Sequence, residues 1–231
     1  MTLLLFDVGG TLLKINPEPK EIYVGIFREM GFDVEKETLF RKIALVKSKI
    51  DNAYKRVDDK GKGVSFPMRF NELLLRECNL PCEKDVSWKV TRMFANGIRF
   101  TRYPETLPVL DDLGGGYEMG IISNWNLDRD LVDVLRENDI LHYFDYTLAS
   151  KDAGCEKPDP KIFNMALRNT GFSARDAYYI GDSYAEDVLG AIGTGIKPIF
   201  VNRRNEPNPK NVPSTDSLAG LTDLLENEAN D

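Results

Sequence analysis

The fold is decided near the start of the chain, in the stretch Leu3-Leu-Leu-Phe-Asp7-Val-Gly9-Gly-Thr11-Leu. Its first four residues form an apolar run as short as a buried strand, and the run ends on the Asp7 carboxylate. Two glycines follow at once and allow the chain to bend sharply. In open parallel sheets, ligands bind beyond the carboxyl ends of the strands. The stretch therefore predicts a buried strand that presents a reactive carboxylate.

The rest of the chain alternates between strand and helix patterns, apart from one block. Short apolar runs predict strands at 3–6, 119–122, 144–149, 177–180 and 198–201. Helical patterns cover 106–113, 127–135, 160–168, 186–192 and 218–225. Such alternation predicts an α/β fold, in which a parallel five-stranded sheet is covered by helices on both faces.

The exceptional block runs from about Pro17 to Phe100 and contains helical patterns only. Its first apolar stripe is Ile22, Ile26 and Met30, and a polar turn follows the second stripe at Asp58-Asp-Lys-Gly-Lys-Gly63. Because the first strand belongs with the sheet, the block is an insertion. We therefore predict a catalytic core of residues 1–16 and 101–231 and an α-helical cap domain of residues 17–100 over the carboxyl edge of the sheet.

The composition restricts the possible partners. The 231 residues are 42% hydrophobic, enough for a sizeable core, and the formal net charge is -7 without any block of basic residues. We therefore expect no nucleic acid and no membrane surface as the main partner. No stretch is long and apolar enough to span a membrane. A small anionic substrate would have to be held by a few local cations, and the sequence leaves the oligomeric state open.

The cysteines and the single histidine exclude further classes. Three cysteines in a spacing that fits no usual metal motif indicate reduced thiols, and the N-terminal apolar run is too short for a signal peptide. We therefore expect a cytoplasmic protein. His142 is the single histidine, and we interpret it as a partly buried structural residue; together with the lack of a Cys/His cluster, this argues strongly against a zinc site or a catalytic triad built on histidine.

Polar side chains follow several of the predicted strands. Asp7 ends the first strand, Ser123 and Asn124 follow the second, Lys157 lies in the loop after the third, and Asp182 follows the fourth. Each of them alone would be an ordinary cap or turn residue. Because the carboxyl ends of parallel strands meet at one edge of a sheet, together they predict a site there.

These residue types fit the transfer of a phosphoryl group. Asp7 could attack phosphorus and become an aspartyl phosphate. Mg²⁺ prefers hard oxygen ligands, and Asp7, Asp182, Asp187 and the carbonyl oxygen of Gly9 could supply them. Four side chains could hold the substrate and stabilise its charge, namely Thr11, Ser123, Asn124 and Lys157.

The same motifs, in this order, resemble the haloacid dehalogenase superfamily. They are Asp-x-x-Gly-Thr-Leu at 7–12, Ser-Asn at 123–124, Lys-Pro-Asp-Pro at 157–160, and Gly-Asp-Ser at 181–183 with Asp187 behind it. The resemblance implies a Rossmann-like core with an α-helical cap inserted after the first motif. It also implies that Asp7 is the nucleophile, that Ser123 and Lys157 hold phosphate, and that Asp182 and Asp187 lie on the metal side.

One position departs from the family pattern. Phosphatases of this superfamily have a second aspartate at the position of Gly9, where it acts as general acid and base. The haloacid dehalogenases usually have a tyrosine there and need no metal. This chain has neither, and so it is most similar to a broad group of hydrolases in which this position varies.

Three hypotheses follow. The first is a magnesium-dependent phosphatase that acts on a small phosphorylated metabolite. The second is a metal-free 2-haloacid dehalogenase, against which the paired acids Asp182 and Asp187 argue, since they would crowd negative charge near Asp7. The third is a catalytically weak protein that binds a phosphate ligand or a partner, a hypothesis that Gly9 keeps open. Trp125 could wall the leaving-group pocket or belong to the core.

Overall fold

The chain folds into two compact units. The computed structural model describes residues 1–54, 66–125, 127 and 129–230, so the predicted turn at 58–63 lies outside the described residues. One unit comprises Met1–Ile15 and Phe100–Asp231, and the other comprises Asn16–Arg99. We call them the sheet unit and the helical unit and describe each by itself.

The sheet unit is built on six strands in the order β5-β4-β1-β6-β7-β8, and every neighbouring pair is parallel. The predicted α/β class with a parallel sheet is confirmed, and all five predicted strands are present. The sixth, β8, is only two residues long, which is too short to leave a pattern in the sequence. The strands are β1 (Leu3–Phe6), β4 (Glu118–Ser123), β5 (Tyr146–Ala149), β6 (Ala177–Gly181), β7 (Lys197–Val201) and β8 (Ser214–Thr215).

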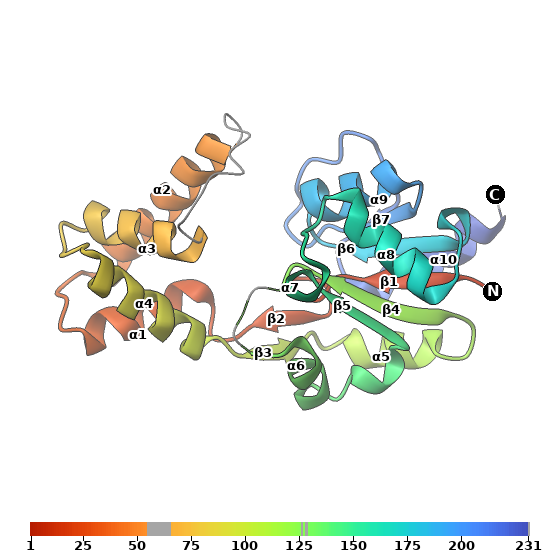
Figure 1. Ribbon diagram of the computed structural model, residues 1–231, viewed down its shortest axis with the longest axis horizontal. Helices are drawn as coiled ribbons and strands as arrows, with labels where there is room; N and C mark the ends of the chain where they lie inside the picture. Colours follow the sequence, from red (N-terminus) through yellow and green to blue (C-terminus); the bar gives the residue numbers. More distant parts are fainter. Residues whose placement is uncertain (55–65, 126, 128, 231) are drawn as a thin grey trace. The chain divides into compact units, whose positions relative to one another are not determined.

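Strand β1 shows how the sheet is covered. All four of its residues are buried, and they belong alternately to two hydrophobic clusters: Leu4 and Phe6 to one, Leu3 and Leu5 to the other. Successive side chains of a strand point to opposite faces, so each cluster marks one face. The first cluster contains helices α5 (Thr106–Leu113), α6 (Leu131–Glu137) and α10 (Leu221–Asn230), and the second contains α8 (Pro160–Thr170) and α9 (Leu189–Thr194) (Figure 1). The result is a core of three layers.

Several predicted helices differ in their bounds: α8 runs on to Thr170, and α10 begins at Leu221 instead of Leu218 and ends at Asn230. Helix α6 begins at Leu131 instead of Leu127, because the Asp130 carboxylate accepts a hydrogen bond from the Val132 amide and caps the helix there. The predicted helix at 186–192 is a π-helix at Tyr184–Val188 that continues into α9. The remaining short elements are α7 (Ser150–Ala153) and 3-10 turns at Leu141–Tyr143, Ala174–Asp176 and Leu218–Gly220.

A small antiparallel sheet was missed by the sequence analysis. It pairs β2 (Leu13–Ile15) with β3 (Phe100–Arg102), and these strands lie at the two points where the chain passes between the units. Each strand has three residues, too few for a periodic pattern.

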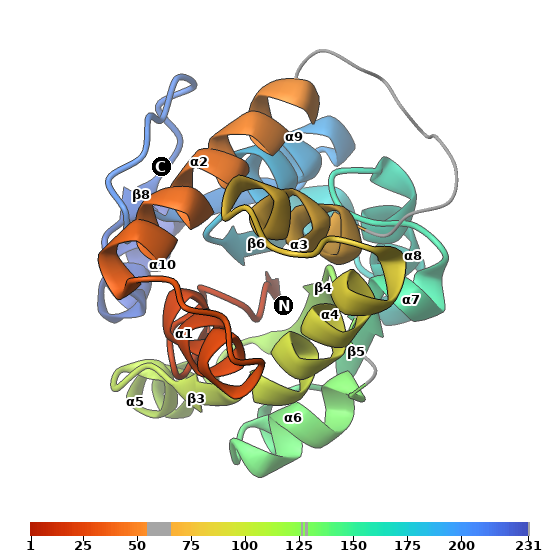
Figure 2. The same ribbon diagram turned by 90° about the vertical axis from the view of Figure 1, so that its left-hand side faces the viewer.

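The described residues of the helical unit form four helices, among which α1 and α3 each contact both α2 and α4 (Figure 2). Two hydrogen bonds, the first buried and the second partly buried, link α1, α3 and α4: the Tyr23 hydroxyl donates to Asn71 Oδ1 over 2.6 Å, and Asn71 Nδ2 donates to Thr91 Oγ1 over 2.8 Å. The Tyr23 ring stacks on Phe94. The helices are α1 (Pro19–Glu29), α2 (Lys36–Tyr54), α3 (Phe66–Glu77) and α4 (Lys84–Gly97).

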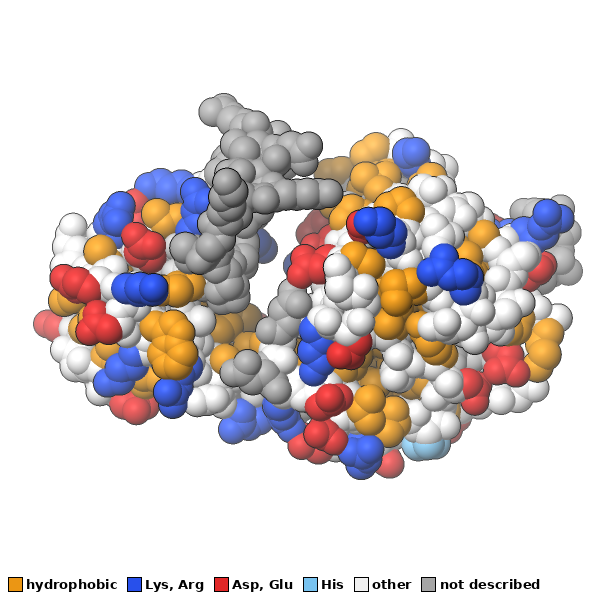
Figure 3. Space-filling view, in the orientation of Figure 1, with side chains coloured by type: hydrophobic (Ala, Val, Ile, Leu, Met, Phe, Trp, Pro, Cys, Tyr) orange, Lys and Arg blue, Asp and Glu red, His pale blue; other side chains and the backbone are white. Residues whose placement is uncertain are grey.

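The surface carries charges of both signs. On the face drawn in Figure 3, acidic and basic side chains are interspersed over the part of the chain that the structure describes. Among those residues, no helix has the length and apolar character needed to cross a membrane.

Candidate active site

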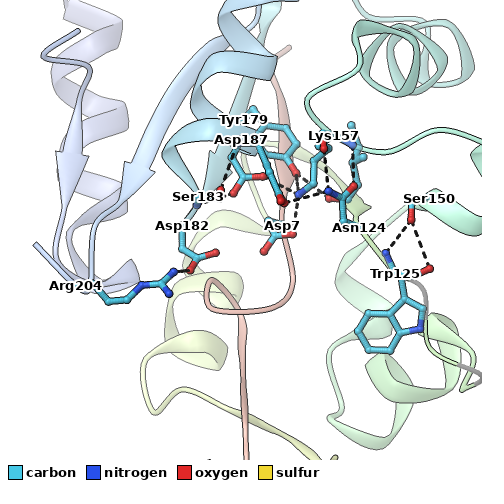
Figure 4. Close-up of polar contacts among 12 residues, drawn as sticks. Asp7, Asn124, Trp125, Ser150, Lys157, Tyr179, Asp182, Ser183, Asp187 and Arg204 are labelled. Atoms are coloured by element: carbon cyan, nitrogen blue, oxygen red, sulfur yellow. Dashed lines mark hydrogen bonds and ion pairs between the residues drawn. The ribbon is translucent and has the colours of Figure 1, made fainter. Parts of the chain in front are cut away.

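Four of the predicted site residues, Asp7, Lys157, Asp182 and Asp187, meet at the carboxyl edge of the six-stranded sheet (Figure 4). Asp7 follows β1, Ser123 is the last residue of β4, and Asp182 follows β6. These three strands are neighbours in the sheet. Lys157, from the loop before α8, reaches the same edge and binds Asp7.

The centre of the site is the buried Lys157 ammonium. Its Nζ lies 2.7 Å from Asp7 Oδ1, 2.7 Å from Asp187 Oδ1 and 2.7 Å from the Tyr179 hydroxyl. The lysine side chain is 1% exposed, and those of Asp187 and Asp7 are 2% and 10% exposed. An ammonium group has three N–H donors, so all three are used. Lys157 thus acts as the counter-ion of two buried carboxylates from distant parts of the chain.

The lysine stays charged in this setting. Burial opposes the charge, but the Asp187 and Asp7 carboxylates hold the pKa of Lys157 well above its usual range. Tyr179 stays neutral because burial raises its pKa, and its hydroxyl donates to the Ile122 carbonyl oxygen over 2.7 Å. The tyrosine oxygen is therefore free to accept from Lys157. The arrangement is a fully hydrogen-bonded ammonium, which is what a buried charge requires.

Beside the lysine, three carboxylates crowd together. Asp7, Asp182 and Asp187 each offer an oxygen atom within 4.8 Å of the other two. Burial, opposed by Lys157 and reinforced by Asp187 and Asp182, raises the pKa of Asp7 to about 7. Burial and the Asp187 charge likewise raise the pKa of Asp182 to about 6. The negative charge exceeds what Lys157 neutralises, and the oxygen donor set has the chemistry that Mg²⁺ prefers.

Two of the carboxylates have further partners, and two glycines let them approach. Asp182 Oδ2 lies 2.5 Å from Arg204 Nη2, and the Ser183 amide donates to Asp187 Oδ2 over 2.9 Å. A Cβ atom on Gly10 would lie 2.3 Å from Asp182 Oδ2, and one on Gly181 would lie 2.3 Å from Asp187 Oδ2. Only glycine fits at these two positions.

Asn124, expected to bind substrate, is engaged with the protein itself. Its Oδ1 accepts the Lys157 amide over 2.7 Å, and its Nδ2 donates to the Lys157 carbonyl oxygen over 3.0 Å. Nδ2 also donates to Glu186 Oε2 over 3.0 Å. The asparagine therefore holds the loop that carries Lys157 and links it to the segment after β6.

The other candidates lie at different depths. Ser123 is nearly buried, while Thr11 is fully buried and its hydroxyl has no hydrogen-bond partner among the described residues. Gly9 is exposed, and no heavy atom would lie within 4 Å of a Cβ atom added there. The left-handed backbone of this turn lies at the next residue, Gly10, whose φ is +91°.

Trp125 belongs to the core. It is 4% exposed, its ring lies 4.9 Å from that of Phe100, and its Nε1 donates to the Arg129 carbonyl oxygen over 2.8 Å. Its backbone amide donates a hydrogen bond to Ser150 Oγ (Figure 4). Of the two interpretations left open by the sequence, the structure favours the core tryptophan.

The sequence analysis missed Tyr179 and Arg204. Tyr179 is one of two adjacent tyrosines in strand β6, and a buried tyrosine hydroxyl requires a polar partner, so the strand carried a signal. Arg204 comes shortly after the carboxyl end of β7, the edge where the other site residues gather. Like Lys157, a cationic side chain at that position could have been predicted to belong to the site.

A doubly wound sheet with a buried carboxylate–lysine network at its carboxyl edge defines an α/β enzyme core. Residues 4–201 match the sequence profile of the family described as haloacid dehalogenase-like hydrolase. The chain belongs to this family and is a hydrolase.

Individual proteins resemble the chain over much of its length. It is 28% identical over 232 residues to the haloacid dehalogenase-like hydrolase domain-containing protein 3 of Danio rerio, covering 95% of this chain and 93% of that protein. It is 29% identical over 176 residues to a glyceraldehyde 3-phosphate phosphatase of Methanothermobacter thermautotrophicus, covering 71% and 76%. The magnesium-bound HAD-hydrolase YfnB of Bacillus subtilis shares the fold, with a TM-score of 0.78, 21% identity and coverage of 97% and 98%.

Replacing Lys157 by methionine should destabilise the metal-free protein strongly and in a pH-dependent way. Losing the cation leaves buried carboxylates unpaired, which costs about 3–5 kcal/mol. The pKa of Asp7 already lies near 7 instead of 3.8, and losing Lys157 raises it further. The variant's folded state therefore binds more protons than its unfolded state, so its stability falls as pH rises through that window.

Urea unfolding with a chelator present, at about pH 5 and about pH 8, measures this difference. We expect a larger loss against the parent protein at the higher pH. Lys151→Met is the matched control, since Lys151 pairs with Asp130 at 3.6 Å on the surface. An equal loss at both pH values would contradict the assigned role of Lys157.

Proposed function

We propose that the protein is a magnesium-dependent phosphatase of a small phosphorylated metabolite, acting through an aspartyl-phosphate intermediate. The observation that carries the proposal is the position of Asp7, which lies against the Lys157 ammonium and shares a cluster of carboxylate oxygens with Asp182 and Asp187. The match to a glyceraldehyde 3-phosphate phosphatase supports phosphate ester hydrolysis.

The proposed metal ligands are the Asp7, Asp182 and Asp187 carboxylates, directly or through water, and the Gly9 carbonyl oxygen. When bound, Mg²⁺ would supply positive charge between the carboxylates and the incoming phosphate. Burial is the main cause of the raised pKa values of Asp7 and Asp182, and the neighbouring carboxylates add to it, so a bound cation would favour the ionised forms of both groups.

In the proposed reaction, an Asp7 carboxylate oxygen attacks phosphorus, and the bond from phosphorus to the leaving oxygen breaks. The departing oxygen takes up a proton. Water then attacks phosphorus and loses a proton, and the bond between phosphorus and the Asp7 oxygen breaks. This step releases inorganic phosphate and restores the Asp7 carboxylate. The Lys157 ammonium, 2.7 Å from Asp7, would exchange one of its present bonds for a phosphoryl oxygen, and Ser123 would hold another.

Further assignments belong to the same proposal. The helical unit, inserted between β2 and β3, would be the cap that selects the substrate. Thr11 would shape the loop beside the phosphate from its buried position. A cytoplasmic location fits the three free cysteines, since a reducing compartment keeps thiols unpaired.

The dehalogenase hypothesis is less favoured by this electrostatic setting. Attack on carbon needs an ionised Asp7, and without an added cation the pKa of Asp7 is about 7. Phosphate release from an aryl phosphate with Mg²⁺, compared with chloride release from a 2-haloacid without metal, separates the two activities. Tight phosphate binding without either release would support the third hypothesis, a protein that only binds.

Replacing Asp7 by asparagine should reduce turnover to background while the protein stays folded. The side chain is nearly isosteric and its oxygen can still accept from Lys157, but the nucleophile is gone. Phosphate release and circular dichroism of the two proteins measure this. An Asp7→Asn variant that still hydrolyses the parent protein's substrates would remove Asp7 from its role.

Replacing Asp182 by alanine should weaken the response to Mg²⁺. Losing a proposed ligand should cost at least the roughly 10- to 100-fold in metal affinity that loss of an outer-shell partner costs. Calorimetric titration with Mg²⁺ measures it without relying on activity. In the parent protein, apparent affinity should rise with pH through the pKa values of about 6 and about 7, as protons leave the carboxylates. An unchanged titration in the variant would remove Asp182 from the metal site.

Gly9 leaves the nucleophile loop without an acidic side chain at this position. General acid catalysis contributes roughly 10²- to 10⁴-fold, and glycine cannot provide it. The parent protein should therefore favour aryl and acyl phosphates over alkyl phosphates, and its rate should fall steeply as the pKa of the leaving group rises. Gly9→Asp should help alkyl phosphates most.

A series of phosphate esters graded by leaving-group pKa, run on both proteins, measures this effect. The added side chain has room, since no heavy atom lies within 4 Å of its Cβ position. Gly9→Ala is the matched control for adding a side chain without a carboxyl group. A flat dependence in the parent protein would show that another group already supplies the proton.

A further inference from the structure

The Arg203 side chain, which follows β7, reaches the loop that carries the nucleophile. Its Nε donates to the Gly10 carbonyl oxygen over 3.0 Å, and its Nη2 donates to the Thr11 carbonyl oxygen over 3.0 Å. Its Nη1 donates to Glu105 Oε1 over 2.7 Å. The guanidinium also lies over the Tyr103 ring, with its Cζ 3.6 Å from the ring centre. One planar group thus makes four fixed contacts.

These contacts form in a largely enclosed setting. The Arg203 and Glu105 side chains are only 16% and 19% exposed. Burial would raise the pKa of Glu105, but backbone hydrogen bonds and Arg203 hold it below its usual range. Glu105 therefore stays ionised and orients the guanidinium. This ion pair differs from the exposed pairs of the surface, which contribute little.

The loop needs such an anchor. Two consecutive glycines, Gly9 and Gly10, give it more conformational freedom than any other pair of residues would. Its carbonyl oxygens at three successive residues are bound from outside: Arg203 takes those of Gly10 and Thr11, and the Thr106 hydroxyl takes that of Leu12 over 2.8 Å. Asp7 lies immediately before this loop, so the anchors limit how far its carboxylate can move.

We propose that Arg203 is a positioning residue for the nucleophile. It sets the geometry of the Gly9–Gly10 loop, and through it the direction of the Asp7 carboxylate, without touching substrate. The two glycines let the carboxylates approach the loop closely but make its backbone flexible. The hydrogen bonds from Arg203 restrict that flexibility. This inference rests on the proposed phosphatase activity.

Arg203→Met tests the proposal, because it removes every donor and keeps most of the apolar stem. With para-nitrophenyl phosphate and Mg²⁺, kcat should fall about 10- to 100-fold while KM changes little, since misplacement of a reacting group acts on the chemical step. Arg203→Lys should not restore kcat, because an ammonium group lacks the planar fork that binds two carbonyl oxygens and a carboxylate together. Exposed Arg175→Met is the matched control and should keep the parent kcat.

A second measurement is independent of activity. Hydrogen exchange of the peptide covering residues 7–13 should speed up in Arg203→Met. The effect should be smaller in Glu105→Gln, because that variant keeps both hydrogen bonds from Arg203 to the loop. Unchanged exchange in this peptide, or an unchanged kcat per folded Arg203→Met molecule, would overturn the positioning role. If the parent protein hydrolyses no phosphate ester but exchange still speeds up, the proposed activity fails while the role of Arg203 in holding the loop stands.

Discussion

The ion pair between the buried Lys157 ammonium and the Asp7 and Asp187 carboxylates is the interaction on which the site depends. A charge in this position is costly unless all its donors are satisfied, and Lys157 satisfies each of its three at 2.7 Å. Asp7 and Lys157 are 150 residues apart in the chain, so the pair forms only when the central strands are assembled. The site therefore forms only when the sheet has formed.

The rest of the edge can be understood as support for this centre. Asn124 binds both backbone groups of Lys157 and so fixes the loop that delivers the ammonium. Gly181 leaves the space that Asp187 occupies, and Gly10 leaves the space beside Asp182. Glycine thus occupies the positions at which a side chain would collide with a carboxylate, whereas a side chain at Gly9 would have room.

Lys157 and Arg203 stabilise the site in different ways. Lys157 balances the charge of Asp7 and Asp187, whereas Arg203 binds backbone carbonyl oxygens of the loop and pairs with Glu105. The Asp7, Asp182 and Asp187 carboxylates together carry more negative charge than the Lys157 ammonium balances, and burial together with this crowding raises the pKa values of Asp7 and Asp182. Such a surplus destabilises a folded chain by itself and is typical of a site that performs chemistry.

The sequence by itself determined the α/β class, the five long strands and the set of polar residues at their carboxyl ends, because buried parallel strands are continuous apolar runs and their ends share one edge. It missed β2, β3 and β8, which are too short to show a period, and it began α6 too early because Asp130 caps that helix locally. Only the tertiary structure decided that Tyr179 completes the lysine's partners, that Asn124 serves the backbone and that Arg203 holds the loop. These roles arise from contacts between residues far apart in sequence, which no local pattern encodes.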